Sequence, residues 1–308
     1  MKRHALPTAL LASAATLALG IGLAGCSTGS SAAPTDSDTI AIVASTNVYG
    51  SIAEAVAGDA ATVTSIIDDP DRDPHEYQAD GQNQLSISKA QIVIENGGGY
   101  DDFVDTMLDA AGNSGVSVLN VADLSGYDQE PADGEFNEHL WYDFPTMEKL
   151  VDSLVSELSA LDSAAASTFE ANGMSAKAKL ADLEAGEAAI KTAHAGAGVA
   201  ITEPVPLYLL DAAGLENRTP DEFSEAIELD TDVPPAVLEA TLALFSTHQV
   251  SALVYNEQTS GAQTDAVVTA AADNGIPAVP VTETLPAGQD YFGWMQANID
   301  AISTALGS

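Results

Sequence analysis

Residues 164–193, AAASTFEANGMSAKAKLADLEAGEAAIKTA, have the composition of one long helix. The stretch contains no proline and only two glycines, so little in it would end a helix. An α-helix rises about 1.5 Å per residue, so a continuous helix here would span about 45 Å. A helix of that length is unusual inside a compact domain. We therefore expect a rigid strut between two halves of the molecule.

On both sides of this stretch, short apolar runs alternate with helix-length segments. Strands are predicted at 39–44, 62–67, 91–95, 116–119, 199–202, 250–255 and 276–281. Helices are predicted at 48–57, 101–111, 145–161, 206–213, 234–247, 261–274 and 290–305, with Asp143 capping the third. Strands that alternate with helices form parallel sheets covered on both faces. The predicted fold class is α/β, with two lobes, each a mostly parallel sheet flanked by helices, joined by one long rigid helix. The predicted boundaries are 39–162 for the first lobe, 163–193 for the connecting helix and 194–308 for the second lobe.

The charge balance is strongly acidic, with 46 Asp and Glu residues against 9 Lys and Arg and a formal net charge of −37. Such a surface repels nucleic acid and anionic membranes, so neither is expected as a partner. The excess is also what solubility or adaptation to high salt would produce, so it does not by itself indicate a specific cation site.

The N-terminus has the pattern of a secretory signal peptide at residues 1–25, with a basic start and an apolar core. Its end, Leu-Ala-Gly-Cys at 23–26, resembles the lipobox of bacterial lipoproteins, which implies lipidation at Cys26. The alternatives are that this segment is an uncleaved membrane anchor, or that the cysteine stands by accident at a cleavage site of small residues. Cys26 is the only cysteine, which excludes an intrachain disulfide. With a flexible linker at 26–38, we expect a secreted protein held by lipid on the outer face of the bacterial cytoplasmic membrane.

Four candidate metal ligands occur in strand-end or loop contexts. His75 lies in Asp-Pro-His-Glu-Tyr at 73–77, after the strand 62–67, and His139 lies in the loop before the helix 145–161. Glu203 directly follows the strand 199–202, and Glu283 follows the strand 276–281 by one residue. Ligands bind beyond the carboxyl ends of parallel strands. Two neutral imidazoles and two carboxylates would form a nitrogen and oxygen site with a formal charge of −2, suited to a divalent cation.

Four motifs together resemble the zinc/manganese family of ABC-transporter solute-binding lipoproteins. They are DPHEY at 73–77, EHLWYD at 138–143, TEP at 202–204 and TETLP at 282–286. The resemblance extends over nearly all of the chain after the signal peptide. It implies a metal between two lobes, with His75, His139, Glu203 and Glu283 as ligands. It also implies a binding protein without enzymatic activity that delivers its metal to an ABC permease. We expect a monomer.

Three questions stay open at this point. Glu257, in Tyr-Asn-Glu-Gln at 255–258, also follows a strand and is the less favoured candidate for the fourth ligand. Glu203 could instead cap the helix that follows it. The transported ion is Mn²⁺ or Zn²⁺: two carboxylates favour the harder Mn²⁺, whereas Zn²⁺ has the higher intrinsic affinity for almost any nitrogen and oxygen site.

Two other functions are compatible with parts of the pattern. A secreted metal-dependent hydrolase would need a general base, for which only Glu76 and Glu138 stand beside a candidate histidine ligand. The sequence has no His-Glu-x-x-His, Gly-x-Ser-x-Gly or glycine-rich phosphate motif to support it. The second alternative is a surface adhesin-type lipoprotein whose metal is incidental.

Overall fold

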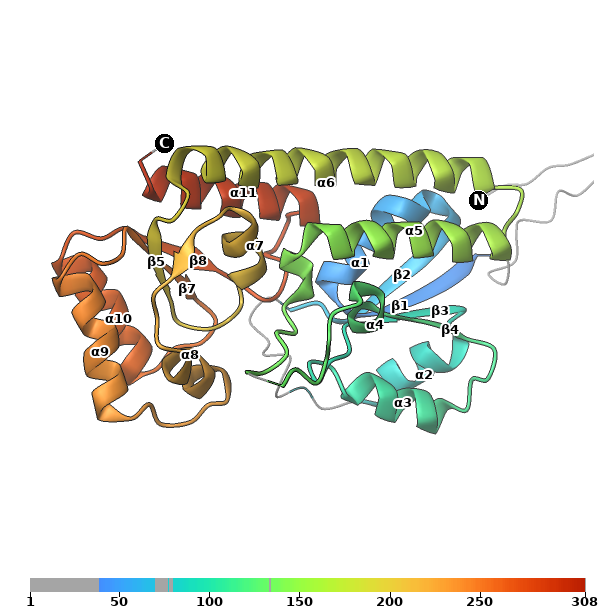
Figure 1. The fold of residues 1–308 in the computed structure, drawn as a ribbon. Helices are drawn as coiled ribbons and strands as arrows, with labels where there is room; N and C mark the ends of the chain where they lie inside the picture. Colours follow the sequence, from blue (N-terminus) through green and yellow to red (C-terminus); the bar gives the residue numbers. More distant parts are fainter. Residues whose placement is uncertain (1–38, 70–76, 78–79, 133, 308) are drawn as a thin grey trace, which may run out of the picture. The chain divides into compact units, whose positions relative to one another are not determined.

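A computed structural model describes residues 39–69, 77, 80–132 and 134–307 (Figure 1). The segment Thr39–Ser308 forms one compact unit. The predicted signal peptide at 1–25, Cys26, the linker at 26–38 and His75 lie outside the described residues.

The first lobe is built on a parallel sheet with the strand order β2-β1-β3-β4. Its strands are β1 (Ile40–Thr46), β2 (Ala61–Ile67), β3 (Ile92–Glu95) and β4 (Ser117–Asn120). The connecting helices are α1 (Asn47–Ala57), η1 (Gly58–Ala60), α2 (Gly81–Lys89), α3 (Phe103–Ala111) and α4 (Val121–Ser125). Alternate residues of β1 enter different cores: Val43 packs with Ile87 of α2 and Met107 of α3, whereas Ile42 belongs to the core that contains α1. The sheet is therefore covered on both faces, as parallel sheets are.

The second lobe repeats this plan with the strand order β6-β5-β7-β8, again all parallel. Its strands are β5 (Gly198–Ile201), β6 (Glu216–Asn217), β7 (Ala252–Asn256) and β8 (Ala278–Val281). Its helices are α7 (Leu207–Ala212), α8 (Asp221–Glu228), α9 (Pro235–Ser246), α10 (Ala262–Asp273) and α11 (Tyr291–Ala305).

Three elements come between the two sheets in the sequence and complete the structure. They are η2 (Leu140–Tyr142), α5 (Phe144–Leu161) and the 29-residue α6 (Ala166–His194). Helix α6 packs against α1 and α5 of the first lobe and against α7 and α11 of the second (Figure 1). Its two glycines lie at helix crossings, with Gly173 against Val155 and Gly186 against Ile299. One helix therefore contacts both lobes along its length.

The predicted fold class is confirmed, with two parallel sheets flanked by helices and one long helix along both. The predicted cap of α5 is also confirmed, because the Asp143 side chain accepts a hydrogen bond from the backbone N–H of Thr146 at 3.2 Å. The sequence did not predict α2, α4, α8 or the two-residue strand β6. Among the described helices, none combines the length and apolar character that crossing a membrane requires.

Candidate metal-binding site

The strand order of each sheet reverses at one point, between β1 and β3 in the first lobe and between β5 and β7 in the second. A ligand crevice forms at such a point, beyond the carboxyl ends of the strands. Hydrogen bonds join the segments at the carboxyl ends of the strands in the two lobes. Asn47, just after β1, donates from Nδ2 to Leu285 O at 3.0 Å and accepts at Oδ1 from Leu285 N at 2.9 Å. The Tyr142 hydroxyl donates to Thr282 O at 2.9 Å.

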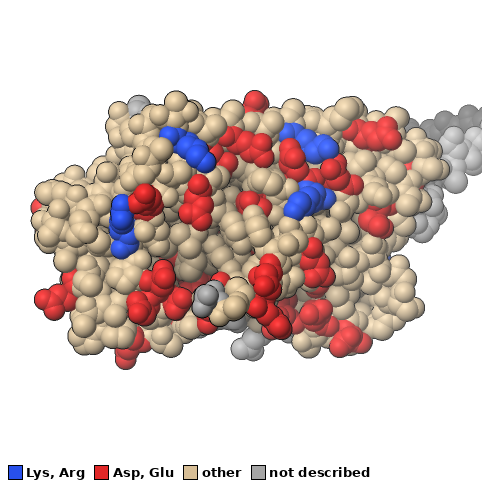
Figure 2. Space-filling view, in the orientation of Figure 1, with Lys and Arg blue, Asp and Glu red and all other residues tan. Residues whose placement is uncertain are grey.

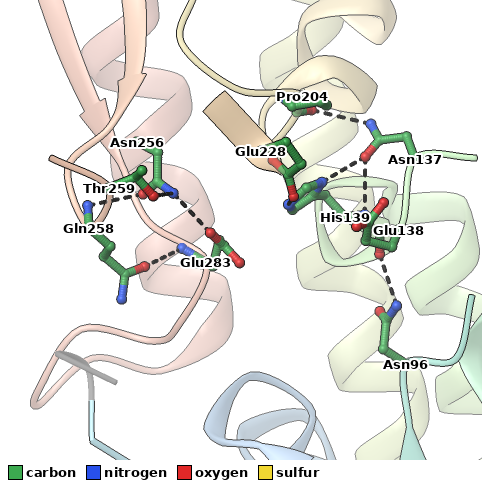
Figure 3. A network of polar contacts seen from close by, with 10 residues as sticks. All are labelled: Asn96, Asn137, Glu138, His139, Pro204, Glu228, Asn256, Gln258, Thr259 and Glu283. Carbon is green, nitrogen blue, oxygen red and sulfur yellow. Dashed lines mark hydrogen bonds and ion pairs between the residues drawn. The ribbon is translucent and has the colours of Figure 1, made fainter. Parts of the chain in front are cut away.

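His139 is fully buried and has its ring orientation fixed by Asn137 (Figure 3). Its Nδ1 lies 2.7 Å from Asn137 Oδ1, and Asn137 Nδ2 donates to Pro204 O at 3.2 Å. The bond to Pro204 identifies which end of the Asn137 amide carries the hydrogens. The other end is therefore an oxygen, which accepts the proton of Nδ1. In this tautomer Nε2 carries a lone pair, which is the form in which a histidine binds a metal through Nε2.

The loop that carries His139 is held by the end of β3. Asn96 Nδ2 donates to Glu138 O at 3.0 Å, and its Oδ1 accepts from the Tyr49 hydroxyl. Asp101 accepts from the backbone N–H groups of Asn96 at 2.7 Å and Gly97 at 2.8 Å. Burial raises the pKa of Asp101, and these hydrogen bonds oppose that rise. A buried polar network thus fixes the backbone next to the candidate ligand.

Aromatic side chains form one wall of the site. The Trp141 ring centroid lies 5.2 Å from that of His139, and the Tyr100 ring lies 6.3 Å from His139. Burial raises the pKa of Tyr100 well above its ordinary value, and the negative charges of Glu283 and, more weakly, Glu228 raise it further. Both carboxylates therefore act on the same buried hydroxyl that borders His139.

Glu283 is buried, with 6% of its surface exposed, and it is oriented by residues at the end of β7. Its Oε1 accepts from Asn256 Nδ2 at 2.8 Å, and its backbone N–H donates to Gln258 Oε1 at 2.6 Å (Figure 3). Glu257, the alternative fourth ligand, is exposed. The buried and oriented carboxylate of the two is Glu283.

Glu203 is also buried, with 3% exposed, directly beyond β5. The next helix, α7, begins at Leu207 with Pro206 in the N-cap position, so Glu203 lies three residues before the cap. Pro204, its neighbour, accepts the hydrogen bond from Asn137. One amide therefore connects the His139 loop to the Glu203 segment.

The sequence did not identify Glu228, the last residue of α8, as part of this neighbourhood. Its Oε1 lies 3.6 Å from His139 Nε2, and its side chain is 12% exposed (Figure 3). The two residues are 89 positions apart, and nothing local in the sequence marks the contact. Within the described part of the chain, no three His, Cys, Asp or Glu side chains stand close enough together to hold a metal.

Comparisons with known proteins agree with this architecture. A model of the family described as zinc-uptake complex component A, periplasmic (ZnuA), matches residues 42–305. The manganese-binding lipoprotein MntA of Halalkalibacterium halodurans is 25% identical over 238 residues, covering 71% of this chain and 77% of MntA. The iron ABC transporter substrate-binding lipoprotein MtsA of Streptococcus pyogenes is 24% identical over 300 residues, covering 88% of this chain and 90% of MtsA.

A solved structure shows the same fold. The periplasmic zinc-binding protein TroA of Treponema pallidum matches with a TM-score of 0.73 at 16% identity, covering 88% of this chain and 100% of TroA. The family resemblance that the four motifs indicate is confirmed by the family match over residues 42–305. The chain belongs to the periplasmic zinc-uptake component A family, whose members are metal-binding components of ABC transporters and not enzymes.

Proposed function

We propose that this protein captures one Mn²⁺ or Zn²⁺ ion in the crevice between its lobes and delivers the ion to an ABC permease. The observation that carries the proposal is the fully buried His139, whose ring orientation is fixed by the contact of its Nδ1 with Asn137 Oδ1. Two buried carboxylates, Glu203 and Glu283, follow β5 and β8, the strands on either side of β7 in the second sheet. This is the donor set of a divalent transition-metal site.

The proposed ligands are His75, His139, Glu203 and Glu283. His75 rests on its DPHEY motif alone, since it lies outside the described residues. Glu257 remains the less favoured fourth ligand, because its side chain is exposed whereas Glu283 is buried. A bound cation would offset part of the cost of removing these two negative charges from water.

Manganese is the proposed ion in the cell, because two carboxylates provide hard oxygen donors and allow more than four coordinating atoms. Zinc is expected to bind well to the purified protein, given its higher intrinsic affinity for nitrogen and oxygen sites. The acidic surface, visible in Figure 2 as Asp and Glu side chains spread over the face with few Lys or Arg, attracts cations of either kind.

The proposal includes the location and organisation of the chain. A lipid at Cys26 would hold the protein on the outer face of the cytoplasmic membrane, with residues 26–38 as a linker after the signal peptide at 1–25. The lobes would comprise 39–162 and 194–308, with 163–193 between them. The protein would act as a monomer beside its permease.

Elemental analysis of the natively purified protein tests the proposed function. We expect about one equivalent of Mn or Zn per chain, and none in a His75→Ala/His139→Ala variant. A His194→Ala/His248→Asn variant is the matched control; asparagine suits position 248 because its φ is +51°. No bound metal in the unaltered protein, even after incubation with both ions, would reject the function. A metal-dependent hydrolase and an adhesin with incidental metal are not favoured by the family to which the chain belongs.

A further inference from the structure

Glu228 approaches the candidate site from an element that carries none of the four expected ligands. It is the last residue of α8, and its Oε1 lies 3.6 Å from His139 Nε2. In the view of Figure 3 the Glu283 side chain lies between the group of Asn256 and Gln258 and the pair of His139 and Glu228.

The distance between His139 and Glu228 suits two ligands of one ion. Protein nitrogen and oxygen ligands lie about 2.1 Å from a bound transition metal. An ion at about 2.1 Å from both Nε2 and Oε1 would see them at an angle of roughly 118°, which is within the range of common coordination geometries. The pair thus needs little movement to accept a cation between its two atoms.

The protonation of His139 favours a cation at this position. With its proton on Nδ1, held by Asn137, the neutral imidazole presents a lone pair at Nε2 towards the carboxylate of Glu228. A carboxylate also presents only lone pairs when ionised. The contact becomes attractive when either a second proton or a metal ion lies between the two atoms. A metal ion between the two atoms accepts a lone pair from each of them.

The surroundings of Glu228 also favour a cation. It is the last residue of α8, where the helix carbonyl groups already present partial negative charge. It lines a cavity of about 240 Å³ between the loop 134–138 and α8. Other acidic residues lining that cavity are Glu135, Glu138, Asp221 and Glu225. A cation in this cavity would therefore lie among several carboxylates, that of Glu228 included.

We propose that Glu228 is a ligand of the transported metal, a third carboxylate beside Glu203 and Glu283. This inference rests on the proposed function. It also assigns Glu228 a role in selectivity. Zn²⁺ is satisfied by four donors, whereas Mn²⁺ takes a larger set of oxygen-rich ligands. Glu228 should therefore contribute more to the affinity for Mn²⁺ than to the affinity for Zn²⁺.

Isothermal titration of the full chain with Mn²⁺ alone and with Zn²⁺ alone tests the proposal. The variant is Glu228→Gln, which keeps the size of the side chain and removes its charge. The matched control is Glu222→Gln, which makes the same change at an exposed position of the same helix. Circular dichroism melts of all three proteins establish that each is folded. Loss of a residue that only supports a metal ligand already costs about tenfold or more in affinity. We therefore expect Glu228→Gln to lower the Mn²⁺ affinity at least tenfold, and to lower the Zn²⁺ affinity clearly less. Glu222→Gln should leave both affinities within about twofold.

Three results would overturn the assignment while leaving the proposed function intact. Equal behaviour of Glu228→Gln and Glu222→Gln would mean that Glu228 is not a ligand. An equal loss for both ions would indicate a charge effect at a distance. Tighter binding by Glu228→Gln would mean that Glu228 competes with the metal for His139. If the unaltered protein binds neither ion, the proposed function itself fails.

Discussion

Asn137 bonds to both lobes through one amide: Oδ1 lies 2.7 Å from His139 Nδ1, and Nδ2 donates to Pro204 O at 3.2 Å. The first contact selects the tautomer of a candidate ligand. The second holds the segment next to Glu203. A side chain that is not itself a ligand therefore orients parts of the site that are 64 residues apart.

Replacing Asn137 should weaken metal binding without unfolding the protein. Residues that hold a ligating histidine typically contribute 10–100-fold to metal affinity, so Asn137→Ala should raise the Kd by about that factor. Titration calorimetry with Mn²⁺ measures the change. Asn172→Ala, on α6, is the matched control, since it also removes a hydrogen bond from an asparagine side chain to a backbone carbonyl, that of Val56 in α1. Equal affinities for Asn137→Ala and Asn172→Ala would show that Asn137 has no role in the site.

A methyl group at Gly173 should destabilise the contact between α5 and α6. An ideal Cβ there would lie 2.5 Å from Val155 Cγ2, and a β-branched side chain in a helix has little freedom to move away. Gly173→Ala should therefore cost about 1–3 kcal/mol of unfolding free energy, although alanine favours a helix. Urea unfolding measures this. The double variant Gly173→Ala/Val155→Ala should recover part of the loss, and a stabilised single variant would contradict the packing argument.

Glu187 predicts a stability that depends on pH. Burial, with smaller contributions from Glu184 and Asp143, raises its pKa from 4.5 to about 8. The folded protein favours the protonated form, so the stabilisation from this group is complete below pH 4.5 and is lost as the pH rises through about 8. Glu187→Gln should thus raise Tm by about 2–4 °C or more at pH 9, with a smaller gain at pH 5.

Thermal melts at both pH values check the Glu187 prediction. Glu170→Gln, at an exposed position of the same helix, should leave Tm nearly unchanged at both. A gain of equal size at pH 5 and pH 9 would show that the charge of Glu187 is not the cause.

The two hydrogen bonds between Asn47 and Leu285 should contribute to both stability and metal retention. They join positions 238 residues apart, just after β1 and two residues beyond Glu283. Asn47→Ala should cost about 1–3 kcal/mol of unfolding free energy and should speed dissociation of the metal. Asn47→Asp keeps the acceptor and loses the donor, so its effect should be intermediate. Chelator-chase kinetics measure dissociation, and an unchanged rate in Asn47→Ala would separate this contact from the site.

The sequence predicted the parts of the fold that have a strong local pattern. The strands 62–67, 199–202 and 276–281 appear as β2, β5 and β8, with no end shifted by more than two residues. Their apolar runs are buried by helices on both faces, so composition alone indicates them. The long helix was predicted from its lack of breaking residues, and α6 is found at Ala166–His194.

The missed elements have weak local patterns. Strand β6 consists only of Glu216 and Asn217, at a sheet edge. Helix α8 has eight residues, with Phe223 and Ile227 forming one short apolar stripe. Glu228 follows that stripe, and its approach to His139 depends on how the lobes meet. The sequence could therefore indicate candidate ligands that follow predicted strands, but it could not indicate a carboxylate placed by tertiary structure. The roles of His75, His139, Glu203 and Glu283 as ligands stay predictions.

The aromatic wall of the site gives the protein an internal optical reporter. The chain has only two tryptophans, and Trp141 lies with its ring 5.2 Å from that of His139. Trp294 packs against Tyr142, whose ring in turn contacts Trp141. A paramagnetic ion such as Mn²⁺ bound at His139 would quench the emission of Trp141, whereas Zn²⁺, with a filled d shell, would change it mainly through its charge. Intrinsic fluorescence can thus distinguish the two ions in the unlabelled protein.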